Sequence, residues 1–248
     1  MGNRNKLKKW IENNLLLFLD RIKNLFSGTL KAVILYGSWA KGTAKKDSDI
    51  DLLLVFSNIN DIIKREVREL ATKINTSHTL DIVTTTSEDF EKEKNPLYTA
   101  VKKEGKIIFG KCDMEIINVE ARIKYKEFFF RSKNFETNKI KMVEKIKKEY
   151  SSYSGIELCW FASKHAIQTC LAMKGCGYSS KFKVLYPLCK KHFGKNIADT
   201  FKKLFHLYIK SEYTTEIPSK EESNLALSLA KEIIKVYDII EKELRLSN

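Results

Sequence analysis

Apolar positions in the first half of the chain fall into short continuous runs and helix-spaced patterns. Apolar runs of strand length occupy residues 31–36 and 50–56. Residues 79–84 are rich in β-branched side chains, which is typical of strands, and a last short strand is expected at 106–109. Residues 60–74 instead carry apolar side chains at helical spacing. The pattern predicts a small sheet with helices in this half of the chain.

The pattern changes near residue 115, and we find no convincing strand after about residue 117. Three long stretches with helical periodicity cover roughly residues 119–150, 156–174 and 225–244, with glycines and prolines between shorter helices. A helical bundle is therefore expected in the second half. The chain is predicted to be an α+β protein with two domains, residues 1–115 and residues 116–248, the second all-α.

Composition indicates a globular protein, since 43% of the 248 residues are hydrophobic and 31% are charged. No apolar run approaches the roughly 18 residues that a membrane span requires. The apolar run at residues 15–19 is broken by Asp20 and Arg21, which favours an amphipathic helix over a signal peptide. We therefore expect a cytoplasmic protein that does not contact a membrane.

The five cysteines are odd in number and lack the spacing of a disulfide framework, which fits a reducing compartment. A zinc site built from Cys176, Cys189 and His192 is conceivable, but two close ligand pairs are missing. Buried free thiols are the preferred interpretation.

A formal net charge of +14 would attract phosphate, whether in a nucleotide, a nucleic acid or an anionic surface. Solvated helix faces in a lysine-rich protein explain the same charge equally well. Charge alone therefore names no partner.

Candidate chemistry gathers at the head of the strand predicted for residues 50–56. Asp49 and Asp51 are separated by one residue, so on a strand both carboxylates point to one face. Two like charges at this distance repel unless a cation lies between them, and hard oxygen ligands suit magnesium. Asp81 lies inside the next strand-like run. If the two strands are neighbours, Asp81 completes a three-acid cluster able to bind a catalytic metal and help deprotonate an attacking hydroxyl.

The turn after the strand predicted for residues 31–36 has the features of a phosphate cradle. Gly37 would let the backbone approach a phosphate closely, and Ser38 offers a hydroxyl donor. A short helix from Trp39 to Gly42 would direct its positive N-terminus to the same place. Lys41, Lys45 and Lys46 add positive charge around it.

Each of these signals is weak alone, and residues 47–49 could simply form a turn or a helix cap. Their joint occurrence in a strand–turn–strand context is specific. Residues 30–110 resemble a minimal nucleotidyltransferase of the DNA polymerase β superfamily. Its pattern is matched by Gly37, Ser38, Gly42, Ser48, Asp49, Asp51 and Leu52.

The resemblance implies a mixed sheet flanked by helices, with an NTP bound at its edge. It implies that Gly37 and Ser38 hold the NTP tail, with Gly42 and Ser48 as further nucleotide-binding candidates. Asp49 and Asp51 would bind two Mg²⁺ ions, and Asp81 would bind the catalytic one. ATP is the expected nucleotide.

Residues 157–175 are similar to the central helix of HEPN domains, which are small helical bundles that often accompany minimal nucleotidyltransferases. Many HEPN ribonucleases carry an Arg four to six residues before a His on this helix. Here the residue five before His165 is Trp160, which puts ribonuclease activity in doubt. We interpret His165 as a helix histidine that faces solvent or makes a polar contact, since a lone His is poor evidence for catalysis.

The leading hypothesis is a nucleotidyltransferase that transfers an NMP, expected to be AMP, from Mg-NTP to an acceptor hydroxyl. The acceptor could be a protein side chain, a small molecule or RNA, and a homodimer stays open. The alternative hypothesis is a toxin–antitoxin-type or RNA-binding module whose basic helical domain binds RNA or a partner protein. In that domain residues 178–191 mix lysines and tyrosines, as nucleic-acid surfaces do.

Overall fold

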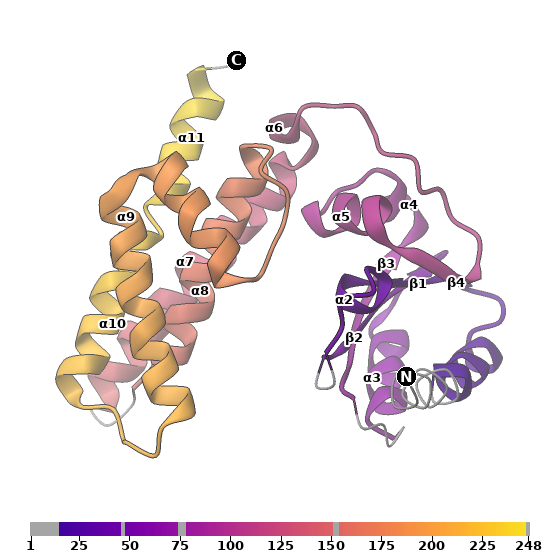
Figure 1. The fold of residues 1–248 in the computed structure, drawn as a ribbon, viewed down its shortest axis with the longest axis horizontal. Helices are drawn as coiled ribbons and strands as arrows, with labels where there is room; N and C mark the ends of the chain where they lie inside the picture. Colours follow the sequence, from indigo (N-terminus) through magenta and orange to yellow (C-terminus); the bar gives the residue numbers. More distant parts are fainter. Residues whose placement is uncertain (1–14, 46–47, 74–77, 151–153, 247–248) are drawn as a thin grey trace. The chain divides into compact units, whose positions relative to one another are not determined.

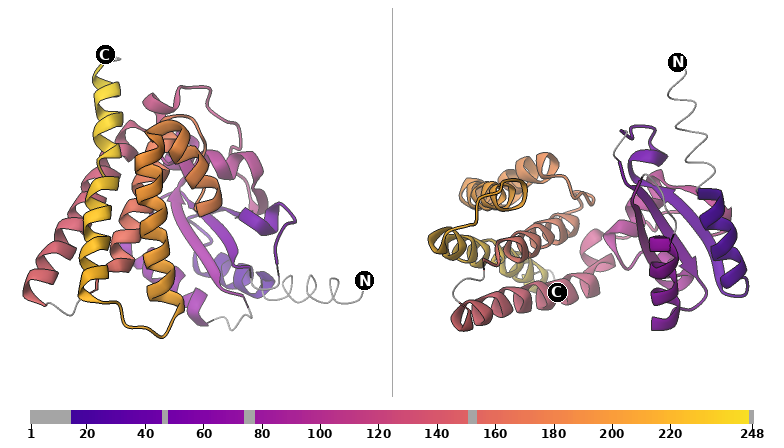
Figure 2. Two further views of the ribbon diagram at one scale, coloured as in Figure 1. Left: turned by 60° about the vertical axis from the view of Figure 1, so that its left-hand side comes forward. Right: turned by 90° about the horizontal axis from the view of Figure 1, so that it is seen from below.

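The computed structural model describes residues 15–45, 48–73, 78–150 and 154–246. The chain divides into two compact units, Met1–Ile117 (the N-terminal unit) and Asn118–Asn248 (the helical unit). Figure 1 and Figure 2 show that the N-terminal unit contains a sheet with helices, whereas the helical unit contains helices. The assignment of the units as independent domains stays a prediction, and each is described by itself.

The N-terminal unit contains a four-stranded mixed sheet. The strands are β1 (Leu30–Tyr36), β2 (Ile50–Phe56), β3 (Leu80–Thr86) and β4 (Lys106–Gly110), in the order β3-β2-β1-β4. Strand β1 is antiparallel to β2 and to β4, whereas β2 and β3 are parallel. All four predicted strands are present, and β3 runs two residues beyond its predicted end.

Helices cover both faces of this sheet (Figure 1). On one face, the helix at residues 15–25 and α3 (Asp61–Lys73) pack against alternate side chains of β2, including Leu52 and Leu54. On the other, α4 (Ser87–Glu91) and α5 (Pro96–Glu104) pack against the intervening side chains. This is why residues 52–56 are all apolar and fully buried: the strand has no solvent face. Burying each such side chain contributes about 1.5–3 kcal/mol.

A buried ion pair closes the C-terminal end of the N-terminal unit. The side chains of Lys102 and Glu93 have no solvent exposure, and the charged atoms lie 3.5 Å apart. Lys102 Nζ also donates to the carbonyls of Glu91 (3.2 Å) and Glu115 (2.6 Å). Glu93 Oε1 accepts from the backbone N–H of Ile117 at 2.7 Å. Residues 115–117 are thereby tied to α5 and to the turn before it.

The helical unit is built around one buried helix. Its elements are α6 (Ala121–Lys124), α7 (Lys126–Glu149), α8 (Ile156–Met173), α9 (Phe182–Tyr213), α10 (Lys220–Ile233) and α11 (Val236–Leu246). Helix α8 packs against α7, α9, α10 and α11, and most of its residues from Ile156 to Met173 are buried. Such a helix is apolar on nearly every side, as its sequence is.

Element boundaries in the helical unit differ from the predicted stretches where local breaks intervene. The stretch predicted from 119 to 150 is split at Tyr125 into α6 and α7. Helix α10 begins at Lys220, five residues before the predicted start, because Ser219 and Glu222 form a capping box. Gly194 has a non-helical φ of 88°, so α9 consists of two helical segments that meet at a kink.

Each helix within the described ranges is either too short or too polar to span a lipid bilayer.

Candidate active site

Asp51 and Asp81 lie side by side on the neighbouring parallel strands β2 and β3. Their Cα atoms are register partners, so both side chains leave the sheet on the same face. Asp49 precedes β2 by one residue, and its charge acts on Asp81. The adjacency that the three-acid hypothesis requires is therefore present between β2 and β3.

The carboxyl group of Asp81 has a pKa above its usual range. Partial removal from water raises this pKa most, and the negative charge of Asp49 raises it further. The side chain still reaches solvent, so a ligand has access to it. A cation at this point would lower the pKa again, because it would stabilise the ionised form.

The backbone at Gly37 lies directly against Asp51. Gly37 has φ of +68°, and a Cβ atom there would lie 2.0 Å from Oδ2 of Asp51, far inside contact distance. Only glycine adopts this positive φ readily and has no Cβ atom to collide with Asp51. Gly42 has φ of +72° but no neighbouring atom within 4 Å of its Cβ position, so its glycine serves the backbone conformation alone.

The turn between β1 and β2 is closed by its own hydrogen bonds. Helix α2 (Gly37–Ala40) begins at Gly37, two residues earlier than predicted, so the Gly-Ser pair is its first turn. The carbonyl of Ser38 accepts from the Thr43 N–H at 2.9 Å. The hydroxyl of Ser48 accepts from the Lys45 N–H at 2.8 Å, so it shapes the turn.

The lysines near this turn differ in their surroundings. Lys41 forms an ion pair with Glu104 at 2.7 Å, which offsets its charge. Lys45 is exposed, and Lys46 lies outside the described residues.

Two aromatic side chains meet the backbone next to Asp49, and sequence reasoning gave neither of them this role. The Ser48 carbonyl oxygen lies 3.2 Å from Trp39 Nε1 and 3.2 Å from His78 Nδ1. No sequence signal marks the contact to His78, because the two residues are 30 positions apart.

The donor set suits magnesium rather than a soft metal. Within the described ranges, no three His, Cys, Asp or Glu side chains are arranged to hold a metal ion unaided. Magnesium commonly takes only one or two carboxylates and completes its shell with phosphate oxygens and water. Asp51 and Asp81 on adjacent strands fit that requirement.

Within the described ranges, the cysteines belong to no group of three potential metal ligands. All five are free thiols. Cys176 Sγ lies 3.2 Å from His192 Nε2. Cys189 is buried, and burial raises the pKa of its thiol to about 12, which keeps the thiol protonated.

His165 has a placed partner that the sequence did not reveal. Its Nδ1 lies 3.1 Å from Oε1 of Glu136, a buried residue of α7 whose other oxygen is 2.8 Å from Lys139 Nζ. The pair borders a cavity of about 300 Å³. Its lining comes from α7, α8 and the following loop: Phe128, Arg131, Ser132, Phe135, Glu136, His165, Thr169 and Tyr178.

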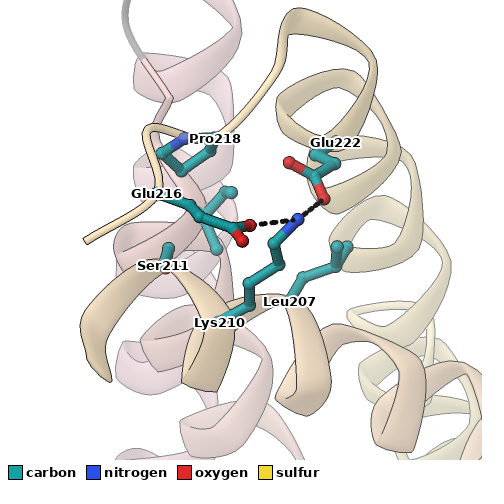
Figure 3. A pocket seen from close by; sticks show the side chains of 7 residues that line it. Leu207, Lys210, Ser211, Glu216, Pro218 and Glu222 are labelled. Carbon is teal, nitrogen blue, oxygen red and sulfur yellow. Dashed lines mark hydrogen bonds and ion pairs between the residues drawn. The ribbon is translucent and has the colours of Figure 1, made fainter. Parts of the chain in front are cut away.

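A second depression in the helical unit is occupied by its own side chains (Figure 3). Lys210 Nζ lies between Glu222 (2.9 Å) and Glu216 (3.0 Å), and these carboxylates raise the lysine pKa. The lysine therefore joins the start of α10 to the loop before it and leaves no space for a ligand.

The comparisons with known proteins identify a family for residues 20–113. The sequence model of the family described as "Polymerase beta, Nucleotidyltransferase" matches residues 20–113. Two proteins of Methanocaldococcus jannaschii, both named "Putative protein adenylyltransferase", are similar to this chain. One is 42% identical over 52 residues, which cover 21% of this chain and 35% of that protein. The other is 30% identical over 95 residues, which cover 37% of this chain and 91% of that protein.

A spectinomycin adenyltransferase from Enterococcus faecialis, solved with ATP and spectinomycin, aligns with 92% of this chain and 97% of its own. The identity is 14% and the TM-score is 0.46, which is too low to support a functional argument. The chain spans about a third of the length of the first M. jannaschii relative and nearly all of the second. The family match therefore rests on the N-terminal unit, where the acids and the turn lie. By its sequence, this chain belongs to the polymerase β-type nucleotidyltransferases.

Proposed function

We propose that this protein transfers AMP from Mg-ATP to a hydroxyl group of an acceptor protein. The observation that carries the proposal is the pairing of Asp51 with Asp81 on adjacent strands, beside the turn that begins at Gly37. The names of the two M. jannaschii relatives support adenylate as the transferred group and protein as the acceptor.

The three aspartates would have different roles in metal binding, according to their positions. Asp49 and Asp51 would hold two Mg²⁺ ions, with Asp81 as a further ligand of one of them. Bound magnesium would supply charge stabilisation for the oxygens that attack and leave. Gly37 and Ser38, with Gly42 and Ser48 shaping the same turn, would accommodate the triphosphate.

The proposed reaction is an in-line displacement at the α-phosphorus. The acceptor oxygen forms a bond to that phosphorus, the bond to the β-phosphate oxygen breaks, and pyrophosphate leaves. Asp81 would accept the hydroxyl proton.

The helical unit would contribute the surface that meets the acceptor. Residues 181–203 contain seven lysines and one aspartate, and that aspartate, Asp199, accepts a hydrogen bond from Tyr186 at 3.2 Å. Lys190, Lys191 and Lys195 are exposed. Such a surface would attract an acidic acceptor, and it fits a role in binding RNA or a partner protein as well.

The direct test is incubation of the purified chain with each α-³²P-labelled NTP, magnesium and a cell extract. We expect label from ATP to appear on protein, in a band that is sensitive to protease and resistant to RNase. The Asp49→Asn, Asp51→Asn double variant is the control, since it removes ligand charge while relieving repulsion between the acids. Undiminished labelling by that variant would overturn the proposal.

A further inference from the structure

The peptide immediately before Asp49 is held by two side chains from different parts of the N-terminal unit. Trp39 Nε1 and His78 Nδ1 each lie 3.2 Å from the carbonyl oxygen of Ser48. A carbonyl oxygen only accepts hydrogen bonds, so the His78 ring must carry a proton on Nδ1. Both side chains are therefore donors to the same oxygen.

The two rings also support each other. Their centroids are 5.4 Å apart at an interplanar angle of 81°, the edge-to-face arrangement that aromatic pairs favour. His78 is only 4% exposed, so its ring is fixed by the surrounding protein. Trp39 belongs to α2, directly after Gly37 and Ser38, and His78 precedes β3.

The peptide after Asp49 is fixed as well. The N–H of Ile50 donates to the Thr79 carbonyl at 2.9 Å. The segment Ser48–Ile50 is thus bonded to His78–Thr79 on both sides of Asp49. Since β3 begins at the next residue, the same contacts set the position of Asp49 relative to Asp81.

This arrangement opposes a specific force. Without a metal ion, the negative charges of Asp49 and Asp81 repel each other. An exposed aspartate in a turn would relieve that repulsion by moving away. Bonds to the peptides on either side of Asp49 prevent the backbone from doing so.

We propose that Trp39 and His78 are positioning residues that hold Asp49 within reach of a metal ion shared with Asp51 and Asp81. The inference rests on the proposed function, because it assigns the two side chains to the same magnesium site. Through Trp39, the turn at Gly37 and Ser38 that would bind the triphosphate is also connected to Asp49, which would bind the metal.

The test measures magnesium dependence by calorimetry, with the full-length chain and the non-hydrolysable analogue α,β-methylene-ATP. His78→Leu removes the donor, whereas His78→Asn is smaller than histidine but places an amide N–H where Nδ1 lies. Trp39→Phe keeps an aromatic ring and removes its donor. We expect His78→Leu and Trp39→Phe to need about 10-fold more Mg²⁺ for half-maximal binding, as losses of outer-shell partners do. We expect His78→Asn to stay close to the unsubstituted protein.

Thermal unfolding without metal measures how far each substitution destabilises the fold, which distinguishes a loss of positioning at Asp49 from a general loss of stability. Trp39→Phe is the milder change and keeps the inference testable if His78→Leu does not fold. Unaltered magnesium dependence in folded Trp39→Phe would overturn the inference, and so would an Asn variant as defective as the Leu variant. Absence of magnesium-dependent binding in the unsubstituted protein would instead count against the proposed function itself.

Discussion

Oδ2 of Asp51 occupies the space where a side chain at Gly37 would begin, since a Cβ atom there would lie 2.0 Å from that oxygen. The carboxylate proposed as a metal ligand and the turn proposed to take the triphosphate are thus in direct contact. A change in the backbone at Gly37 would therefore also move the carboxylate of Asp51.

The first prediction compares alanine at Gly37 with alanine at Gly42. Both have positive φ, so both substitutions should cost about 1–2 kcal/mol from backbone strain. Only Gly37→Ala also displaces Asp51, so it should lower the free energy of unfolding further and abolish transfer. Urea unfolding and ATP labelling check both variants. Equal effects at the two positions would show that contact with Asp51 is unimportant.

The second prediction concerns the pH dependence of stability through Asp81. Its folded-state pKa lies above the ordinary value of 3.8, so the fold favours the protonated form. This stabilising contribution is present below about pH 4 and is lost as pH rises through the folded-state pKa. Asp81→Asn should therefore raise Tm at pH 7 in metal-free buffer and change it little near pH 3.5, while transfer is lost.

Asp49→Asn provides the control for this pH effect. It removes the second cause of the raised pKa, so the stability of that variant should depend less on pH across the same range. A lower Tm for Asp81→Asn at pH 7 would contradict the assigned direction.

The third prediction tests the basic surface of α9. Charge reversal at Lys190, Lys191 and Lys195 should reduce transfer to protein on the order of 10-fold, because electrostatic attraction speeds association. Binding of α,β-methylene-ATP should not change, since the proposed nucleotide contacts lie in the N-terminal unit. Reversal of the three exposed lysines Lys126, Lys141 and Lys145 on α7 is the matched control. Equal loss of nucleotide binding and transfer would refute this division of roles.

The fourth prediction is that the purified chain does not cleave RNA without a metal ion. Trp160 takes the place where an arginine is expected, and it stacks on Phe201 and Tyr208 with ring centroids 5.1 Å and 5.5 Å away. That buried ring supplies no cation to His165. RNA cleavage that persists in EDTA and disappears in His165→Ala would show that the His165–Glu136 pair, with Arg131 in the same cavity, has a catalytic role.

The sequence predicted the sheet well because its strands are local apolar runs. Strand β2 has the predicted bounds, because a continuous apolar run of this length is typical of a strand that is buried on both faces. The pairing of Asp51 with Asp81 could only be hypothesised, because strand order depends on contacts that no local pattern encodes. For the same reason, the bonds from His78 to Ser48 and from His165 to Glu136 were not foreseen.

Helix ends in the second half were predicted less well than the helices themselves. A capping box extends α10 towards the N-terminus, and the glycine at 194 kinks α9 without ending the helical region. Periodicity reports which face of a helix is buried, whereas its ends depend on single hydrogen bonds.

The buried Lys102–Glu93 pair has a consequence for where this catalytic unit can be cut from its neighbour. Glu115 and Ile117 supply backbone partners to the two buried charges, so this segment is part of the N-terminal unit although its side chains are exposed. A fragment that stops at Lys111 would leave both charges short of a partner, which is costly in a dry interior. One that continues through Ile117 retains them. Any transfer of this unit to a different partner, by gene fusion or in the laboratory, would need to carry residues 112–117 along.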